Sequence, residues 1–536
     1  MSYGIGIDTG GTFTDAVLVN LETNKVEAFA KVPTTHYDLK EGIEKSLEKL
    51  FSETDVSKSD ISKVGVSSTL ATNAVVENKG GDVALFIIGI EDHLEVPAAG
   101  FKFIEGGHDI KGNEVMKLDI ESIVSGVEFF RGNVDSYAVV SAMSFANSSH
   151  ELVAKKAINM VDPKPVYVSS EVSSVPGIEE RATTTVLNAR LMPVMDNFIN
   201  GLKQSILKYI KEDALKIING EGGFLNFEDA VKKSVLTFGS GPASTAYYGA
   251  VNAKNAVVID IGGTTTDILL VEDFAPVTDS RSKIGTYETH VKSVRMKTIG
   301  LGGDSRVGFD NRNNITVGTD RVEPLCFSED VPSPGSWLDL PVQDSVFYMR
   351  NNPPSDPRSF CEIFKEKKYP GMNDFYKSAG KGERTKETVK DFVKKGFFGA
   401  LGFTPTDALA VLGKIDAPYI EKSVEAAKIL SEYNNTDYKE FCAYIIQRVE
   451  NCIAEAVIDF LARYSSGKSI NDVFPDWKNN KYLDIRFSSK FPVIGSGAAA
   501  KYFLEGVSQK LGAELILPEY YEIGNALGAL KIVIDK

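Results

Sequence analysis

Two short segments, far apart in the chain, combine paired glycines with threonines and aspartates. The first runs Asp-Thr-Gly-Gly-Thr-Phe-Thr-Asp from Asp8 to Asp15, and the second runs Asp-Ile-Gly-Gly-Thr-Thr-Thr-Asp from Asp260 to Asp267. Over twelve positions counted from the first aspartate, eight are identical. Glycine pairs let backbone N–H groups turn toward an anion, and threonine hydroxyls add further donors. The repeat therefore predicts two loops that bind the phosphates of one nucleotide, ATP.

The first aspartate of each segment, Asp8 or Asp260, ends a strand at the mouth of the turn. Carboxylates beside phosphate oxygens need a cation between them, so we expect both to hold Mg²⁺, largely through waters, and to act in catalysis. One of them could orient the attacking nucleophile. Asp15 and Asp267 are expected to support the turn. The predicted nucleotide-binding residues are Gly10, Gly11, Thr12, Thr14, Gly262, Gly263, Thr264, Thr265, Gly302, Gly303, Gly495, Ser496 and Gly497.

The alternative interpretation of each segment is a tight hairpin without a ligand. Paired glycines alone fit that interpretation, but a hairpin turn has no need for the same threonines and aspartates twice. The sequence contains neither the Walker A pattern nor the GxGxxG pattern of dinucleotide-binding folds. We therefore favour phosphate binding.

Four further glycine-rich or small-residue clusters follow in a defined order. The clusters at 238–244 and 525–530 are expected to form helices that cross closely at a hinge. The cluster at 300–304 is expected beside the second hairpin, and the one at 493–500 is expected to contact the adenosine. For each cluster alone, simple helix packing is the alternative.

The elements that must position these residues follow from the local patterns. Each repeated segment lies between two β-rich runs, which predicts a β-hairpin. After the first hairpin we expect a strand at 26–32, a helix at 39–51, a strand at 64–67 and a helix at 71–78. This order is that of a ribonuclease-H-like lobe. The predicted fold is α/β, with two ribonuclease-H-like lobes of the actin-like ATPase type facing a nucleotide cleft, with insertions.

Length and composition are consistent with that architecture. A chain of 536 residues is too long for one compact core. We expect an N-terminal lobe at 1–235 with an α/β insertion near 81–165, and a C-terminal lobe at 236–536 with an irregular insertion near 318–400. The net charge of −14 argues against a nucleic-acid or membrane partner. The four cysteines form no CxxC pair, and the absence of a basic leader or a long apolar run predicts a cytoplasmic protein.

Several longer motifs resemble the hydantoinase A/5-oxoprolinase family, which includes a subunit of acetone carboxylase, within the actin–Hsp70–hexokinase superfamily. The matching motifs are IDTGGTFTDAV near the start, STLATNAVVENKG at 68–80, SSEVSSVPGIEERATTTVLNARLMPVM at 169–195, FGSGPAS, VVIDIGGTTTDILLVED at 257–273, IGLGGDS at 299–305 and TPTDALAVLG at 404–413.

The resemblance implies an ATP-dependent hydrolase subunit. Such proteins activate a cyclic amide, such as hydantoin, 5-oxoproline or a related lactam, or a related carbonyl compound, by phosphorylation. A second hydantoinase-type subunit is an implied partner, and a homo-oligomer is compatible with the pattern. The alternatives are an ATPase that activates or assembles a partner enzyme, a small-molecule kinase, a filament-forming ATPase and a degenerate nucleotide-binding protein.

Three other places carry chemistry-bearing residues. His108 lies in a glycine-rich loop, where it is expected either to contact a ligand or to be merely exposed. Glu179, Arg181 and Thr183 lead a helix and either face the cleft or form a surface charge pair. Asp407 is expected to be the N-cap of the helix that follows it.

Overall fold

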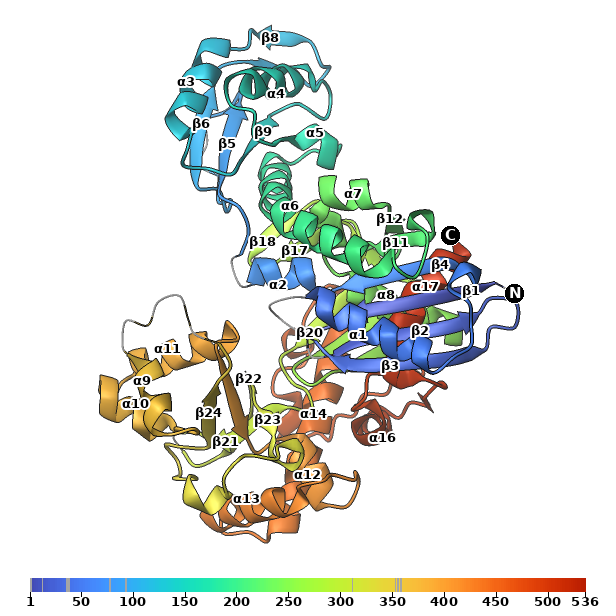
Figure 1. Ribbon diagram of the computed structural model, residues 1–536, viewed down its shortest axis with the longest axis vertical. Helices are drawn as coiled ribbons and strands as arrows, with labels where there is room; N and C mark the ends of the chain where they lie inside the picture. Colours follow the sequence, from blue (N-terminus) through green and yellow to red (C-terminus); the bar gives the residue numbers. More distant parts are fainter. Residues whose placement is uncertain are drawn as a thin grey trace. The chain divides into compact units, whose positions relative to one another are not determined.

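The computed structural model describes residues 2–11, 13–34, 39–76, 79–91, 94–310, 312–351, 353, 356 and 359–536. Its chain divides into two compact units, each built from segments that are distant in sequence (Figure 1). The predicted α/β class is confirmed. The first unit comprises Met1–Val251, Phe274–Arg295 and Ile523–Lys536, and the second comprises Asn252–Asp273 and Met296–Glu522.

A six-stranded mixed sheet forms the centre of the first unit. Its strand order is β12-β11-β4-β1-β2-β3, and the neighbours β1 and β4, like β4 and β11, are parallel. The helix α1 (Leu39–Ser52) packs on β2 and β3 through the buried side chains of Ile43, Leu47 and Leu50. The strands are β1 (Tyr3–Thr9), β2 (Phe13–Asn20), β3 (Val26–Pro33), β4 (Ile61–Ser68), β11 (Leu215–Ile218) and β12 (Phe224–Leu225).

The last helix of the chain, α17 (Gly524–Asp535), lies directly on β1 and β4 of this sheet (Figure 1). Glycines in the strands permit the close approach: a Cβ placed on Gly6 would lie 1.9 Å from the Ala526 carbonyl oxygen. A Cβ on Gly65 would lie 2.3 Å from the Ala529 carbonyl oxygen. Only glycine fits such helix–strand contacts, so the alternation of glycine in β1 serves packing.

The same helix also crosses α8 (Ser240–Asn252) at a contact without room for a side chain. A Cβ on Gly528 would lie 1.9 Å from the carbonyl oxygen of Ser244. The predicted pairing of the two small-residue helices is therefore correct.

A second sheet of the first unit is purely parallel, in the order β10-β9-β5-β6. The helix α6 (Ile178–Ile206) serves both sheets, because Ala182 and Val186 pack against this one while Phe198 and Leu202 pack in the core of the first. Its other elements include β5 (Val83–Ile88), β6 (Gly100–Ile104), β9 (Ser136–Ser141), β10 (Val166–Val168), α3 (Ile120–Phe130), α4 (Ser149–Val161) and α5 (Ser169–Val172).

The remaining elements of the first unit are short. The helix expected at 71–78 is α2, and residues 77 and 78 lie outside the described part of the chain. These elements are α2 (Leu70–Val76), α7 (Phe227–Lys232), β7 (Gly107–His108), β8 (Glu114–Met116), β16 (Thr278–Asp279), β17 (Ser282–Ile284), β18 (Tyr287–Thr289) and β19 (Ser293–Val294).

The central sheet of the second unit repeats the pairing of the first. The hairpin β13–β14 is antiparallel, β20 adds to β14 as β3 adds to β2, and β26 and β27 follow in parallel as β4 and β11 do. Two sheets with one topology are the expected product of two ribonuclease-H-like units. The strands are β13 (Ala256–Ile261), β14 (Thr266–Glu272), β20 (Met296–Ile299), β26 (Val493–Ser496) and β27 (Leu515–Ile516).

The segment near 318–400 builds a small core of its own around Phe360, Phe375 and Phe398. In its described residues it contains parts of a hairpin and of a three-stranded sheet, together with three α-helices. The additional elements of the second unit are β21 (Ser305–Phe309), β22 (Ile315–Arg321), β23 (Glu323–Pro324), β24 (Ser345–Met349), β25 (Phe398–Gly402), α9 (Phe360–Glu366), α10 (Met372–Ala379), α11 (Glu383–Lys394), α12 (Pro405–Val411), α13 (Ile420–Tyr433), α14 (Tyr438–Ser466), α15 (Ile470–Val473) and α16 (Ala500–Lys510).

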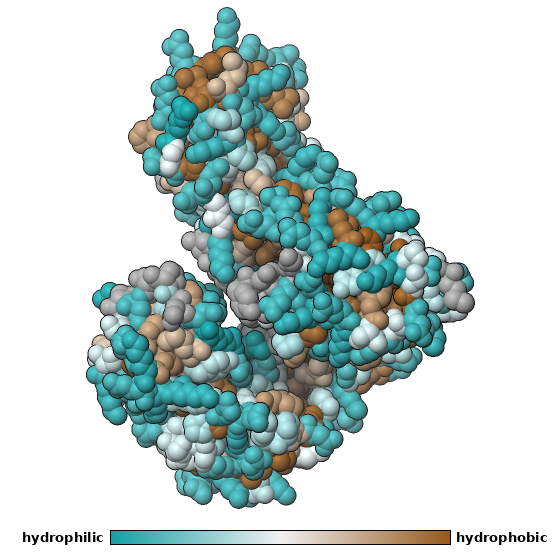
Figure 2. Space-filling view, in the orientation of Figure 1, coloured by the Kyte–Doolittle hydropathy of each residue, from teal (hydrophilic) through white to brown (hydrophobic). Residues whose placement is uncertain are grey.

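The surface shown in Figure 2 is largely hydrophilic, and hydrophobic residues form scattered patches on it. This distribution fits a chain in which 25% of the residues are charged. Among the described helices, none combines the length and the apolar composition that a membrane span requires.

Candidate functional site

The two predicted phosphate-binding segments have the same strand register. Asp8 lies opposite Asp15 in the β1–β2 hairpin, and Asp260 lies opposite Asp267 in the β13–β14 hairpin. In each hairpin, one more residue pair lies between the paired aspartates and the turn. The sequence repeat therefore reflects a structural repeat, with one copy in each unit.

The turns themselves are closed by equivalent hydrogen bonds. The Gly10 N–H donates to the Phe13 carbonyl oxygen at 3.0 Å, and the Gly262 N–H donates to the Thr265 carbonyl oxygen at 3.0 Å. Thr12, a predicted site residue, lies outside the described residues. Each turn exposes one of its paired glycines, Gly11 in the first turn and Gly262 in the second, while Gly263 is half-buried. Backbone is therefore accessible to a ligand at both turns.

Asp8 is held in a defined orientation within the first unit. Its side chain is only 4% exposed, and its Oδ1 accepts a hydrogen bond of 2.6 Å from the Ser67 hydroxyl. The Asn525 amide of α17 lies 3.5 Å from the other carboxylate oxygen. Gly241 of α8 also faces Asp8, because a Cβ there would lie 3.8 Å from Oδ1. Strand β4 and helices α8 and α17 thus meet at this carboxylate.

Asp260 has the corresponding place in the second unit. Its parallel neighbour on β26 is Ser496, which therefore occupies the position that Ser67 has beside Asp8. The next residue, Gly497, has φ +87°, and a Cβ there would lie 2.5 Å from Asp260 Oδ1. Gly497 must therefore be glycine both for its backbone conformation and for its contact with the carboxylate.

The predicted site residues Gly302 and Gly303 lie against the second turn. Gly303 N–H donates to the Gly262 carbonyl oxygen at 3.1 Å, and Asp304 N–H donates to the Gly263 carbonyl oxygen at 2.7 Å. A Cβ on Gly302 would lie 2.4 Å from the Gly262 carbonyl oxygen. The loop at 300–304 thus braces the turn through backbone contacts, and the Gly303 N–H is used inside the protein.

The predicted site residues that remain differ in their surroundings. Gly11 and Thr265 are exposed at their turns, and Thr264 is half-buried. Thr14 is buried, and its hydroxyl lies 3.1 Å from the Thr34 hydroxyl. Gly495 lies inside β26, where neighbouring leucines fill the space that a side chain would need.

The second aspartate of each hairpin, Asp15 or Asp267, is bonded by a side chain of an adjacent strand, and the bonding residue differs between the two hairpins. Asp15 forms an ion pair of 2.9 Å with Lys31, whereas Asp267 accepts a 2.6 Å hydrogen bond from the Thr298 hydroxyl. Burial, with a smaller contribution from the nearby Asp260 charge, raises the pKa of Asp267 to about 6, although the Thr298 hydrogen bond opposes this shift.

The carboxylates fit a magnesium ion by their donor chemistry. Mg²⁺ prefers oxygen ligands and commonly takes one or two carboxylates, with waters and phosphate oxygens completing its shell. Asp8 and Asp260 are each the next-to-last residue of a strand that leads into a glycine turn, and the backbone of Gly497 lies close to the Asp260 carboxylate. Within the described part of the chain, no cluster of three or more histidine, cysteine, aspartate or glutamate residues could hold a metal by itself.

Arg181 has a role that the sequence did not predict. It is fully buried and donates to the Ser169 hydroxyl at 3.0 Å and to the Ser141 carbonyl oxygen at 2.8 Å. Glu151, also fully buried, lies 4.0 Å from it. This network joins α6 to the parallel sheet, so Arg181 belongs neither to a surface charge pair nor to an open cleft.

The exposed alternative for His108 is wrong, and so is the expectation for Asp407. His108 is buried, and its ring lies 4.1 Å from that of His150. Thr404, rather than Asp407, is the N-cap of α12, and Asp407 is the third residue of the resulting capping box. Its carboxylate is fully buried and also accepts a 2.6 Å hydrogen bond from Ser423.

Sequence reasoning missed the residues that hold the paired aspartates. Ser67, Lys31 and Thr298 each bond an aspartate of a hairpin from an adjacent strand. The available signal was that Ser67 and Ser496 both lie near the end of a β-rich run followed by a helix. Alone, that signal does not identify the strand pairing.

Two family models match this chain, and the residues they match include parts of both units. The model of the hydantoinase/oxoprolinase N-terminal region matches residues 4–161, and the hydantoinase/oxoprolinase model matches residues 181–531. The chain is 28% identical to caprolactamase subunit alpha of Pseudomonas jessenii over 366 residues, which cover 61% of this chain and 52% of that protein. It is 24% identical to 5-oxoprolinase 1 of Arabidopsis thaliana over 439 residues, covering 70% of this chain and 34% of that protein.

A solved structure shows the same fold. Acetone carboxylase without nucleotide matches with a TM-score of 0.69 at 16% identity, covering 98% of this chain and 70% of that chain. The chain spans about half the length of the caprolactamase relative and a third of the 5-oxoprolinase.

Proposed function

Because the chain belongs to the hydantoinase/oxoprolinase family, we propose that it uses ATP to activate a cyclic amide or a related carbonyl compound by phosphorylation. The observation that carries the proposal is the repeated hairpin, with the same aspartate register and the same turn hydrogen bond in both units. Acetone carboxylation by the solved relative is ATP-dependent, which supports the use of ATP here.

Phosphorylation by ATP would make the carbonyl carbon of a cyclic amide reactive toward water. An amide carbonyl is a poor electrophile because the nitrogen lone pair is delocalised into it. Transfer of the γ-phosphoryl group to the amide oxygen gives an imidate-like species and ADP. Water can then attack the carbon, and the tetrahedral species breaks its C–N bond while the nitrogen takes a proton, which leaves an acyl phosphate. A second water hydrolyses the acyl phosphate to a carboxylate and inorganic phosphate.

The residues of this chain would position the reactants. Backbone N–H groups near Gly11 and Gly263 would bind phosphate oxygens, while Asp8 and Asp260 would hold Mg²⁺. Bound there, the ion would neutralise charge on the phosphates. The Ser67 hydrogen bond stabilises the ionised form of Asp8 and fixes its direction.

A partner subunit belongs to the proposal. The caprolactamase relative is named as subunit alpha, and this chain covers about half of it. We place the protein in the cytoplasm with a second hydantoinase-type subunit that completes ring opening.

The test is ATP hydrolysis by purified protein with hydantoin, 5-oxoproline and other lactams, with and without the candidate partner. Stimulation by one lactam is expected, and Asp8→Asn and Asp260→Asn should each abolish it. Asp55→Asn, an exposed aspartate on the same unit as Asp8, is the matched control and should retain full activity. Full stimulated activity in Asp8→Asn would refute the assignment of that carboxylate.

The main alternative is an ATPase that activates or assembles a partner enzyme. Relatives of this chain are named as subunits of larger enzymes, which favours this alternative over the other classes. In that case the partner protein, but none of the lactams, would stimulate ATP hydrolysis. A small-molecule kinase would instead release a stable phosphorylated product, which phosphorus NMR would detect.

A further inference from the structure

A largely buried carboxylate lies against the turn of the β13–β14 hairpin, the second glycine turn. The exposed fraction of the Asp304 side chain is 16%, and its Oδ2 atom would lie 2.5 Å from a Cβ placed on Gly263. The Asp304 N–H donates to the Gly263 carbonyl oxygen at 2.7 Å. Because carboxylate and phosphate charges repel each other, a phosphate at this turn requires a cation that compensates Asp304.

Arg321, in β22, supplies a cation at that carboxylate. Its Nε and Nη2 atoms lie 3.3 Å and 3.2 Å from Asp304 Oδ2, which is the same oxygen that faces Gly263. The guanidinium group is therefore at the second glycine turn. Burial raises the pKa of the Asp304 carboxyl, and the Arg321 charge opposes this shift, so the pair stabilises the ionised carboxylate.

Backbone contacts fix the place of Arg321. The N–H of the next residue, Val322, donates to the Asp304 carbonyl oxygen at 3.0 Å. Ser305, which follows Asp304, is the register partner of Arg321 in the β21–β22 hairpin. The start of β21 and the end of β22 are thus both tied to the loop that braces the second glycine turn.

The guanidinium group keeps donors for a ligand. An arginine has five N–H donors, and among the groups that the structure describes Arg321 bonds only Asp304. Both of these bonds are longer than the about 2.7–2.9 Å of a strong arginine–carboxylate bond. The Arg321 side chain is 28% exposed, so a ligand can reach it. Its paired N–H groups match the geometry of phosphate oxygens.

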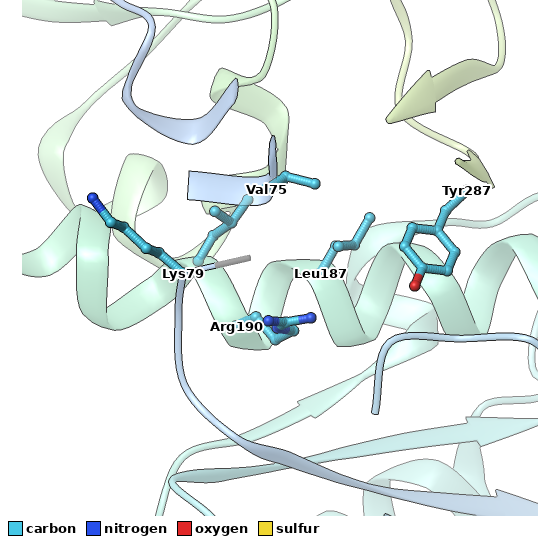
Figure 3. Close-up of a pocket in the computed structure, with 6 residues that line it drawn as sticks. Val75, Lys79, Leu187, Arg190 and Tyr287 are labelled. Carbon is cyan, nitrogen blue, oxygen red and sulfur yellow. The ribbon is translucent and has the colours of Figure 1, made fainter. Parts of the chain in front are cut away.

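An arginine of the first unit shows the contrast. Arg190 of α6 lines a small cavity with Leu187 and Tyr287 (Figure 3), and its Nη1 donates to the Pro97 carbonyl oxygen at 3.4 Å. That bond connects α6 to the segment that leads into β6. Arg321 is instead bonded to a residue that itself contacts a glycine turn.

We propose that Arg321 binds a phosphate oxygen of the nucleotide at the second glycine turn, and that Asp304 positions the guanidinium group for this contact. The assignment rests on the proposed use of ATP. It adds a cationic side chain to a site otherwise built from backbone N–H groups, threonine hydroxyls and carboxylates. The arginine neutralises phosphate charge and compensates the Asp304 carboxylate.

Nucleotide affinity tests this proposal without any lactam. In calorimetry of MgATP with the full chain, Arg321→Gln should raise the Kd about tenfold or more, because a charge-assisted contact is lost. The affinity for adenosine, which has no phosphate, should not change in ligand-observed NMR, whereas a merely structural role would weaken both ligands. Arg321→Lys keeps the charge and should give an intermediate Kd for MgATP.

A double variant tests the role of the carboxylate. In Arg321→Gln, Asp304 is left unpaired beside the phosphate, so adding Asp304→Asn should recover part of the lost MgATP affinity. Arg306→Gln is the matched control, because Arg306 has a similar exposed fraction of 27% but pairs with Asp344 and Asp320. It should leave the Kd for MgATP unchanged. Circular dichroism should show that each variant is folded, and Arg321→Lys carries the test if Arg321→Gln is not.

The outcomes separate this proposal from the proposed lactam activation. If the wild type binds MgATP but no lactam stimulates hydrolysis, the predicted order of Kd values would still support the Arg321 assignment. An unchanged Kd for MgATP in Arg321→Gln, equal losses of MgATP and adenosine affinity, or no recovery in the double variant would overturn it. Absence of MgATP binding by the wild type would overturn both proposals.

Discussion

Ser67 on β4 donates a 2.6 Å hydrogen bond to Asp8, its register partner on the parallel strand β1. The pair lies at the carboxyl ends of both strands, where the open α/β sheet presents its ligand-binding edge. Ser496 lies beside Asp260 in the same register in the second unit. This serine–aspartate pairing extends the repeat beyond the glycine hairpins.

Replacing Ser67 by alanine should lower lactam-stimulated ATP hydrolysis by about tenfold, because a buried carboxylate loses a charge-assisted hydrogen bond. The loss should appear in kcat more than in the KM for the lactam. Ser62→Ala, on the same strand but exposed at its other end, should leave the kinetics unchanged. Equal rates for wild type and Ser67→Ala would show that this bond does not position Asp8.

Two glycines should separate ligand binding from folding. A Cβ on Gly11 would meet nothing within 4 Å, so Gly11→Ala should fold normally but raise the KM for ATP by about tenfold if phosphate oxygens approach that backbone. A Cβ on Gly302 would lie 2.4 Å from the Gly262 carbonyl oxygen, so Gly302→Ala should lower the melting temperature. Thermal melts with ATP titrations measure both effects, and unaltered ATP affinity in Gly11→Ala would argue against the phosphate assignment.

Gly6→Ala should destabilise the first unit by about 2–4 kcal/mol, because its Cβ would lie 1.9 Å from the α17 backbone. Urea unfolding followed by circular dichroism measures this change. Gly382→Ala, whose Cβ would meet nothing within 4 Å, is the control and should shift the midpoint little. Comparable stability of Gly6→Ala and wild type would mean that α17 does not pack as described.

The free energy of unfolding should fall as pH rises from about 4 to 6, through the titration of Asp267. The folded chain keeps this proton up to a pKa of about 6, whereas the unfolded chain releases it near the ordinary value of 3.8. Between these values the folded state binds more protons, so raising the pH favours unfolding. Asp267→Asn should remove that dependence and be more stable above pH 6 by about 1–3 kcal/mol.

Asp15→Asn is the matched control for Asp267, since it alters the equivalent residue of the other hairpin. It removes an ion pair with Lys31 and should therefore destabilise the protein or leave it unchanged at pH 7. Urea unfolding at pH 4, 5, 6 and 7 measures both variants. A stability of Asp267→Asn below that of wild type at pH 7 would contradict the assigned direction.

The α/β class and the family followed from local sequence, because strand–turn–strand patterns and long motifs are properties of contiguous residues. The contact between α17 and β1 was harder to predict. The sequence showed small residues in both elements, but Gly6 and Ala526 lie at opposite ends of the chain. Glycine alternation in a strand indicates close approach only when the approaching element is known.

Buried polar residues show most clearly what could not be predicted from the sequence. Arg181 lies in a motif that marks the family, yet its complete burial depends on serines and a glutamate contributed by other elements. Burial of an arginine is costly without such partners, so composition alone favours an exposed position.

By itself, the sequence determined that two glycine–threonine–aspartate hairpins exist, because their turns depend on adjacent residues. Only the tertiary structure decided what holds each aspartate, which glycines brace a turn, and that Arg190 and Tyr287 line one cavity. Those relationships depend on strand register and on contacts between distant segments, and no local pattern specifies them.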